Sequence, residues 1–207
     1  MGQFYNILIG DAMGNNKELY NPSVKCADGK IVYDGDKLME HSYVDTAFTM
    51  GLASMLINHP KRIVWVGDYA DEVAWGDELF LVNPKVWADK PNVDIPTYHE
   101  AWPCDNSERS VNEAFCFSWE GLKLINHDKK VYVDMETYIR NNTVKVGKWL
   151  VSVSPLSLLT AVGNGRGSGD YRGTDMDKVG KWAWNLIEFS KSVPDGYEEL
   201  TLGFKEG

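Results

Sequence analysis

The pattern of apolar and polar positions predicts short strands in the first third of the chain. Residues 3–10 alternate loosely and are rich in strand-forming residues, and a turn is expected at 14–16. Residues 30–43 contain two strand-like runs around an Asp-Gly dipeptide, which is typical of hairpin turns. Residues 61–71 form a short apolar run that ends in Gly-Asp, so we expect a buried strand with polar residues at its exit.

Two segments have the apolar spacing of a helix. The first follows Asp45, the expected N-cap, and ends before Pro60, because Phe48, Leu52, Met55 and Leu56 share one helix face. The second follows Asp175 or Asp177 and ends near residues 194–196. Its expected buried face consists of Val179, Trp182, Ala183, Leu186 and Ile187.

The remaining pattern predicts hairpins rather than repeating strand–helix units. Residues 121–139 contain two strand-like runs around the turn 127–130, where His127 is expected in solvent. Residues 149–162 predict a strand that Pro155 breaks or ends. The proline-rich segment 82–112 has no sustained period and is expected to be irregular. The fold predicted for residues 1–207 is one α+β domain with a mainly antiparallel sheet, built from hairpins, and two main helices packed on it.

Composition limits the classes of function. The chain has 207 residues, 43% of them apolar and 12% aromatic, which is enough for a substantial core. It carries 30 acidic and 21 basic residues and a net charge of −9, which disfavours long nucleic acids and anionic membrane surfaces as partners. Three cysteines without a CxxC pair fit a reduced cytoplasm, and no apolar run is long enough for a membrane span. The sequence does not set the oligomeric state.

A glycine-rich segment is the strongest candidate site. Five of the 19 glycines fall within residues 163–173, with sequence GNGRGSGDYRG. Glycine lowers stability by about 0.5–1 kcal/mol per site in regular structure, so the run indicates a backbone shape or a close approach that a Cβ atom prevents. Its backbone N–H groups are suited to an anion, and its arginines to a phosphate or carboxylate. The predicted ligand-binding residues are Gly163, Asn164, Gly165, Arg166, Gly167, Asp170, Tyr171 and Arg172.

Two structural alternatives to this ligand site stay open. The segment matches neither the GxGxxG pattern that opens a dinucleotide-binding helix nor the GxxxxGK[ST] phosphate loop. It is also compatible with tight turns, in which Asn164 and Asp170 bond to nearby backbone, or with a flexible surface loop.

Carboxylates and a histidine near expected strand ends form a second candidate set. Glu40, His41, Asp68 and Asp71 are the candidate catalytic residues, as an acid/base pair or as ligands of a divalent cation if the chain is an enzyme. Neighbouring strand residues point to opposite faces, so Glu40 and His41 cannot both face one pocket unless the strand bends. The alternative is that each is a surface or capping group.

Several motifs resemble those of a family of uncharacterised bacterial and phage proteins. They are GQFY near the N-terminus, KLMEHSY, RIVWVGDYAD, LINHDKKVYVD and LTAVGNGRGSGDYRG. The resemblance spans most of the chain, departs from the family in the proline-rich middle, and implies a microbial or viral source and one intact domain. It implies no activity.

The leading functional hypothesis is a cytoplasmic protein, in a bacterium or a phage-infected cell, that binds a small anionic ligand such as a nucleotide. The phage association makes capture of a host nucleotide signal, as in anti-defence, a reasonable extension by analogy. The second hypothesis is a hydrolase of a phosphoester or related bond. The third is a protein-interaction module whose glycine run shapes an interface.

Overall fold

The main feature of the fold is a mixed, mainly antiparallel sheet. The computed structural model describes residues 5–14, 18–20, 23–25, 31–33, 37–38, 42–67, 73–75, 78–80, 118–163 and 170–205. Within them, an eight-stranded sheet has the order β14-β9-β8-β13-β5-β1-β2, with β12 also paired to β5. Its strands are β1 Tyr5–Gly10, β2 Glu18–Tyr20, β5 Lys61–Gly67, β8 Lys123–Asn126, β9 Val131–Asp134, β12 Ala161–Val162, β13 Leu186–Ser190 and β14 Glu198–Glu199.

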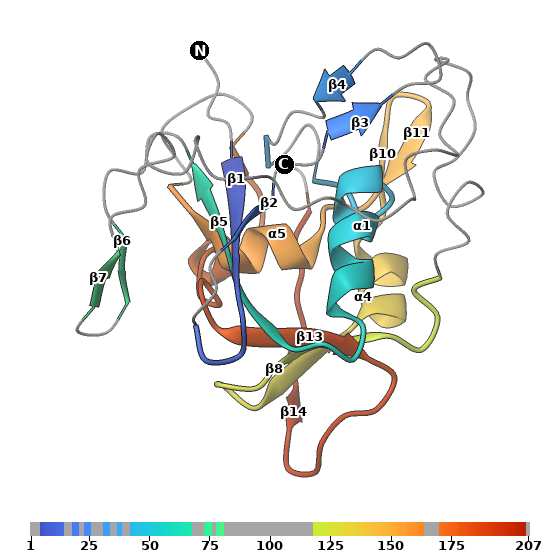
Figure 1. The fold of residues 1–207 in the computed structure, drawn as a ribbon. Helices are drawn as coiled ribbons and strands as arrows, with labels where there is room; N and C mark the ends of the chain where they lie inside the picture. Colours follow the sequence, from blue (N-terminus) through green and yellow to red (C-terminus); the bar gives the residue numbers. More distant parts are fainter. Residues whose placement is uncertain are drawn as a thin grey trace.

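Short hairpins and helices complete the described part of the chain. Three two-stranded pairs join β3 Ser23–Lys25 with β4 Ile31–Tyr33, β6 Val73–Trp75 with β7 Glu78–Phe80, and β10 Val144–Val146 with β11 Trp149–Val151. The helices are α1 Ala47–Leu56, α4 Met135–Asn142, α5 Pro155–Thr160 and the 3-10 turn η2 Met176–Lys178. Figure 1 shows α1, α4 and α5 gathered on one side of the twisted sheet. The predicted α+β class with a mainly antiparallel sheet is therefore confirmed.

The middle of the sheet is buried on both faces. Tyr5, Ile7 and Ile9 of β1 face the main core, together with Ile63 and Trp65 of β5. The alternate residues of the same strands belong to a smaller cluster on the other face, formed by Leu8, Val64, Val66 and Trp184. This double coverage explains the continuous apolar run that predicted β5 as a buried strand.

Several predicted elements are present close to their expected positions. β1 lies within residues 3–10, β5 within residues 61–71, and β8 and β9 form the hairpin with its turn at 127–130. Helix α1 occupies the first helical segment, but its N-cap is Thr46 rather than Asp45, and the Thr46 hydroxyl accepts from the Thr49 N–H at 3.3 Å.

The second predicted helix is wrong. Only the short turn η2 is helical there, and the residues from Leu186 onward form β13, between β8 and β5. The backbone gives the reason, because Gly180 and Trp184 have φ angles of +76° and +59°, which interrupt a right-handed helix.

Residues 34–36 and 39–41 of the hairpin expected within 30–43 lie outside the described residues, so this pairing stays a prediction. β4 pairs with β3, which precedes it, while Tyr43 forms a bridge with Val153. Helices α4 and α5 were not predicted. The strand expected to reach Pro155 ends at Val151, and Pro155 is the first residue of α5. The segment 82–112 lies outside the described residues.

Candidate functional site

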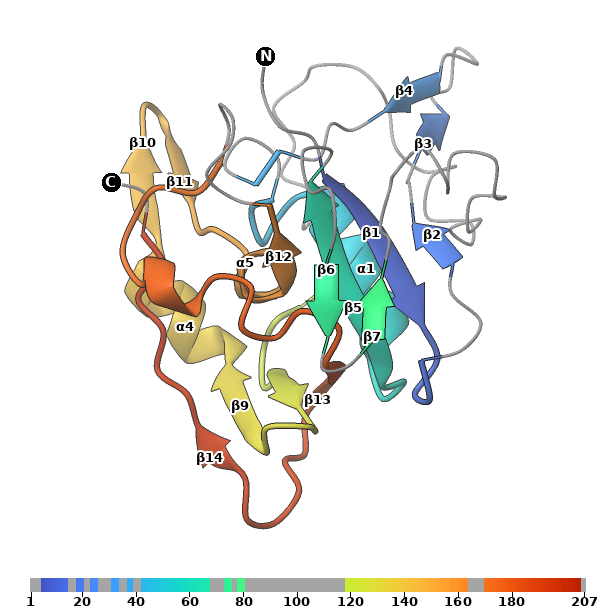
Figure 2. The same cartoon turned by 90° about the vertical axis from the view of Figure 1, so that its left-hand side faces the viewer.

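Two strands end side by side where the glycine-rich segment begins. β12 is parallel to β5, with Ala161 opposite Trp65 and Val162 opposite Val66. In Figure 2 the arrowheads of β5 and β12 point the same way. The chain therefore leaves both strands at the same edge of the sheet. Gly163 follows β12 directly, and Asp68 is the next residue after β5.

The far end of the glycine-rich segment returns to the same edge. Asp170 is 4% exposed, and its Oδ1 accepts a hydrogen bond of 3.1 Å from the hydroxyl of the buried Tyr5. Tyr5 begins β1 and lies opposite Gly67, the last residue of β5. One hydrogen bond between residues 165 positions apart thus ties the exit of the segment to the strand edge at which it starts.

Tyr171 strengthens this anchor. Its ring is fully buried and packs edge-on against Phe204, with 5.6 Å between ring centroids. Its hydroxyl donates to the Thr174 carbonyl oxygen at 2.6 Å and accepts from the Lys205 N–H at 3.1 Å. Burial raises the pKa of this phenol above its ordinary value, although its hydrogen bonds act in the opposite direction. Tyr171 therefore holds the C-terminal segment against the exit of the glycine-rich segment.

Two glycines at the ends of the segment have identifiable structural reasons. Gly163 has φ +103°, a conformation that side chains with a Cβ atom rarely adopt. At Gly173, an added Cβ atom would collide with the carbonyl oxygen of Lys205 and would lie 2.5 Å from the Tyr171 hydroxyl. Part of the glycine content therefore serves a backbone shape and a close approach that a Cβ atom prevents, as the sequence predicted.

The C-terminal segment is itself pinned beside this exit. Asp175 Oδ2 accepts from the Gly203 N–H at 2.6 Å and from Lys178 Nζ at 3.0 Å. Burial alone raises the pKa of the Asp175 carboxyl, but these two hydrogen bonds and the Lys178 charge lower it below its ordinary value overall. The hydroxyl of Thr174 also donates to the Gly203 carbonyl oxygen.

The predicted ligand-binding residues fall into two groups. Gly163, Asp170, Tyr171 and Arg172 are described, and of these Arg172 is exposed. The others, Asn164, Gly165, Arg166 and Gly167, lie outside the described residues. What the structure provides is therefore the two ends of the segment, both held at one sheet edge.

The four candidate catalytic residues, Glu40, His41, Asp68 and Asp71, all lie outside the described residues. Their flanking positions are described. β5 ends with Gly67 at the edge that also bears Gly163, and Asp68 and Asp71 follow it in the sequence. His41 precedes Ser42, whose carbonyl oxygen accepts from the Ser154 N–H at 2.7 Å, just before α5. Ser154 directly precedes α5, whose other end joins β12 at Ala161.

Buried hydroxyls surround the start of α5. Ser42, Ser152 and Ser154 are each at most 2% exposed. Among the described residues, the Oγ atoms of Ser152 and Ser154 have no hydrogen-bond partner. Such a polar interior next to Ser42 is unusual, because buried hydroxyls normally form hydrogen bonds. Sequence patterns gave no signal for it.

His127 is more enclosed than its turn position suggested. Its Nε2 lies 3.0 Å from Glu188 Oε1, its Nδ1 lies 3.0 Å from the Tyr197 hydroxyl, and only 21% of its side chain is exposed. An ionised carboxylate only accepts, so Glu188 keeps the proton of a neutral imidazole on Nε2 and leaves Nδ1 to accept from Tyr197. These contacts tie β13 and the segment before β14 to the β8–β9 turn.

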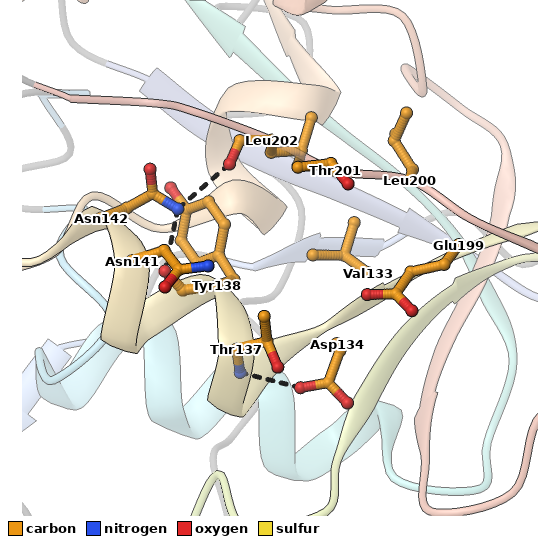
Figure 3. Close-up of a pocket in the computed structure, with 10 residues that line it drawn as sticks. All are labelled: Val133, Asp134, Thr137, Tyr138, Asn141, Asn142, Glu199, Leu200, Thr201 and Leu202. Carbon is orange, nitrogen blue, oxygen red and sulfur yellow. Dashed lines mark hydrogen bonds between the residues drawn. The ribbon is translucent and has the colours of Figure 1, made fainter.

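Figure 3 shows a small cavity where α4, β9 and the C-terminal segment meet. Its volume of about 30 Å³ is enough for a single water molecule. Asn142, in its wall, donates to the carbonyl oxygens of Tyr138 at 2.8 Å and Leu202 at 3.1 Å. Asp134, also in the wall, caps α4 by accepting from the Thr137 N–H at 2.8 Å. We interpret this cavity as part of the scaffold that holds the C-terminal segment.

No metal site emerges from the part of the chain that the structure describes, where no three His, Cys, Asp or Glu residues are grouped to hold an ion. Among the described helices, none is long and apolar enough to cross a membrane.

Comparisons with protein-family models, with curated proteins and with solved structures find no match to this chain. The resemblance of its motifs to bacterial and phage proteins therefore stays a prediction, and a functional argument has to start from the sheet edge itself.

Proposed function

We propose that the chain binds a small phosphate-bearing ligand, such as a nucleotide, at the sheet edge where β5 and β12 end. The observation that carries this proposal is the parallel pairing of the two strands. It brings the start of the glycine-rich segment next to the carboxyl end of β5, which Asp68 follows in the sequence. Ligands of sheets with parallel strands bind beyond the carboxyl ends of those strands, so the edge is a suitable position for a site.

The proposal divides the candidate residues by role. Arg166 and Arg172 bind the phosphate through their guanidinium groups, while the glycine backbone and Asn164 supply further donors. The buried Asp170 and Tyr171 hold the exit of the segment in place. This division of roles is supported by the exposure of Arg172. It is also supported by the hydrogen bonds that hold its two neighbours, from the Tyr5 hydroxyl to Asp170 and from the Tyr171 hydroxyl to the Thr174 carbonyl oxygen. An anchored loop loses less conformational entropy on binding than a free one.

The test measures unfolding of the purified chain with mono-, di- and cyclic nucleotides, with and without Mg²⁺ or Mn²⁺. A ligand present at 100 times its dissociation constant adds about 2.7 kcal/mol to the free energy of unfolding. We expect a clear increase in melting temperature for the wild type and none for Arg166→Ala. Arg140→Ala, an exposed arginine on α4, is the matched control and should bind like the wild type. Full retention of affinity by Arg166→Ala contradicts the proposal.

A hydrolase acting on a phosphoester is the second candidate, because Asp68 and Asp71 follow β5 in the sequence and β5 ends beside Val162, the residue before Gly163. In that case these carboxylates, with Glu40 or His41, act as acid and base or hold a divalent cation. Chromatography of each nucleotide after incubation separates the two candidates. Metal-dependent product that is lost in Asp68→Asn favours hydrolysis, whereas ligand recovered unchanged favours binding alone.

Binding without turnover is also the result expected of a phage protein that captures a host nucleotide signal. If no nucleotide shifts the melting temperature and none is converted, a protein-interaction module becomes the better proposal. The glycine-rich segment would then contact a protein rather than a phosphate.

A further inference from the structure

A larger pocket than that of Figure 3 lies where the end of α1 meets the end of β13. Its volume is about 340 Å³, within the range of about 300–1,000 Å³ that is usual for sites of small molecules. Ile57 and Asn58 line it directly after α1, Leu122 just before β8, and Ser190 and Lys191 at the end of β13. In Figure 1 the lower end of α1 lies close to β13, which it contacts.

The pocket is separate from the proposed nucleotide site. Asn58 comes three residues before β5, which begins at Lys61, whereas the glycine-rich segment starts beside the opposite end of that strand. The seven residues of β5 span about 20 Å. A ligand in this pocket is therefore a second ligand, and its binding does not depend on the function proposed above.

Hydrogen bonds hold the backbone and the side chain of Asn58 in place. Asn58 has φ +56°, a left-handed conformation that asparagine tolerates better than most residues, and its N–H donates to the Phe189 carbonyl oxygen at 2.8 Å. The buried hydroxyl of Ser190 donates to Asn58 Oδ1 at 3.1 Å and accepts from the Ser192 N–H at 3.2 Å. Because the Ser190 proton goes to Asn58, Oδ1 is the acceptor of this amide and Nδ2 is left as a donor.

The pocket offers more hydrogen-bond donors than acceptors to a ligand. Asn58 Oδ1 and the Ser190 oxygen already accept within the chain, and the oxygen of Ser118, also in the wall, accepts from a backbone N–H at 3.2 Å. Within the described part of the chain, by contrast, Asn58 Nδ2, the Ser192 hydroxyl and Lys191 Nζ have no hydrogen bond or ion pair. Donors beside an ammonium group favour a ligand with negatively charged oxygen atoms.

The electrostatics of the pocket suit one negative charge. Among the described residues that line it, Lys191 alone is charged, and its side chain lies beside Gly121, where an added Cβ atom would be 3.9 Å from the Lys191 Cδ. The C-terminal end of α1 opposes this charge with about half a negative elementary charge. The remaining positive charge matches a carboxylate better than a phosphate dianion, which arginines bind more effectively.

We propose that this pocket binds a small monocarboxylate with an apolar tail. Lys191 Nζ, Asn58 Nδ2 and the Ser192 hydroxyl donate to the carboxylate. The tail lies against the buried Leu122 and the half-buried Ile57. Apolar walls with a few converging polar groups are typical of pockets that bind small ligands.

The probe is hexanoate, and NMR of the backbone and asparagine side-chain amides follows its binding to the full chain. We expect saturable shifts at Asn58, Lys191 and Ser192, with half-saturation near about 1 mM, a modest strength for about eight non-hydrogen atoms. Hexan-1-ol and hexylamine have the same tail without the negative charge and should bind at least tenfold more weakly. Shifts that do not saturate within tenfold of the expected concentration, or equal binding of hexylamine, overturn the proposal. Inorganic phosphate that binds as tightly as hexanoate overturns the carboxylate assignment.

Lysine variants test the charge. Lys191→Met removes the ammonium group but keeps a long side chain, so it should weaken hexanoate binding at least tenfold, while Lys191→Arg should retain binding. Lys129→Met is the matched control, because it changes an exposed lysine in the β8–β9 turn, at the other end of β8 from Leu122. Equal losses in Lys191→Met and Lys129→Met, or no loss in either, refute the role of Lys191.

Asn58→Asp tests where the carboxylate lies. Aspartate tolerates a positive φ and still accepts from Ser190, so the melting temperature should not change. Its carboxylate replaces the amide donor with a second negative charge, so hexanoate binding should be lost. Arg166→Ala should bind hexanoate like the wild type, whatever its effect on nucleotide binding. Wild-type affinity in Asn58→Asp, or a loss in Arg166→Ala, contradicts the proposal.

Discussion

Removing the Tyr5 hydroxyl is the most direct probe of the proposed site. Tyr5→Phe keeps the ring in the main core and deletes only the donor to Asp170. Both residues are buried, so water cannot easily replace the lost donor. The variant thus tests a hydrogen bond that connects the exit of the glycine-rich segment to the edge of β5.

The expected magnitude follows from burial and from the nature of the acceptor. A hydrogen bond to a charged group contributes about 1.5–3 kcal/mol, more than a bond between two neutral groups. We expect Tyr5→Phe to lower the free energy of unfolding by this amount. For a domain of this size, each kcal/mol corresponds to a decrease in melting temperature of about 2–4 °C.

The assay is urea unfolding at neutral pH, with the slope against denaturant compared between variants so that a change in midpoint reports stability. Tyr132→Phe is a matched control, because the Tyr132 hydroxyl makes only a long 3.4 Å hydrogen bond to Glu199 at an exposed position. We expect this control to change stability by less than about 0.5 kcal/mol. If Tyr5→Phe is as stable as the control, the anchor described here contributes nothing.

The same variant separates anchoring from ligand contact. Tyr5→Phe should lose stability without ligand and should also bind nucleotide more weakly, because the exit of the segment is less ordered. Arg166→Ala should lose binding at unchanged stability. A Tyr5→Phe protein that is destabilised yet binds with wild-type affinity would show that the anchor supports the fold but not the site.

Three further predictions concern the framework around the site. Gly173→Ala should destabilise the chain by about 1–3 kcal/mol in urea unfolding, because its methyl group meets the Lys205 carbonyl oxygen. In the folded chain the Asp175 carboxylate accepts a hydrogen bond from the Gly203 N–H, and its pKa lies below the ordinary value. Its contribution to the free energy of unfolding should therefore be complete above the ordinary pKa of about 3.9, and it should be lost as the pH falls toward the lower pKa of the folded state. Asn142→Ala, which removes two buried hydrogen bonds, should cost about 1–3 kcal/mol by the same assay.

Each of these has a control on the same chain. Gly196→Ala has no atom within 4 Å of the added carbon and pays only for its positive φ, so a cost equal to that of Gly173→Ala excludes the collision. Asp175→Asn should differ from wild type most at neutral pH and least in acid, and a pH-independent difference contradicts the ionic contribution. Asn141→Ala, its exposed neighbour, should be nearly neutral, and a loss equal to that of Asn142→Ala removes the argument from burial.

Local patterns of apolar and polar residues were sufficient to predict several elements of the fold. The apolar run of β5, the helical spacing of α1 and the turn between β8 and β9 all depend on residues close in sequence. Helix α4 was missed because it is short and buries little, with Met135, Tyr138 and Asn142 as its buried residues. The second predicted helix failed despite its helical apolar spacing, because the positive φ angles of Gly180 and Trp184 interrupt a right-handed helix.

The candidate site was likewise predictable from the sequence only in part. The glycine content marked residues 163–173 as special, and close packing at Gly173 is one reason for it. Which strand would lie beside β12 was not predictable, because β12 has only two residues and its partner β5 precedes it by almost 100 positions. Likewise, no pattern links Tyr5 to Asp170 or His127 to Tyr197.

The sequence by itself determined the α+β class, the hairpin around residues 127–130, the buried strand β5 and the unusual glycine segment, since each depends on the order of neighbouring residues. Only the tertiary structure decided that β13 is a strand inside the sheet and that β12 runs parallel to β5. It also decided that Asp170 and Tyr171 are buried anchors rather than surface groups. The physical reason is that strand pairing and the burial of polar groups are set by partners far away along the chain, whose contacts outweigh local propensity.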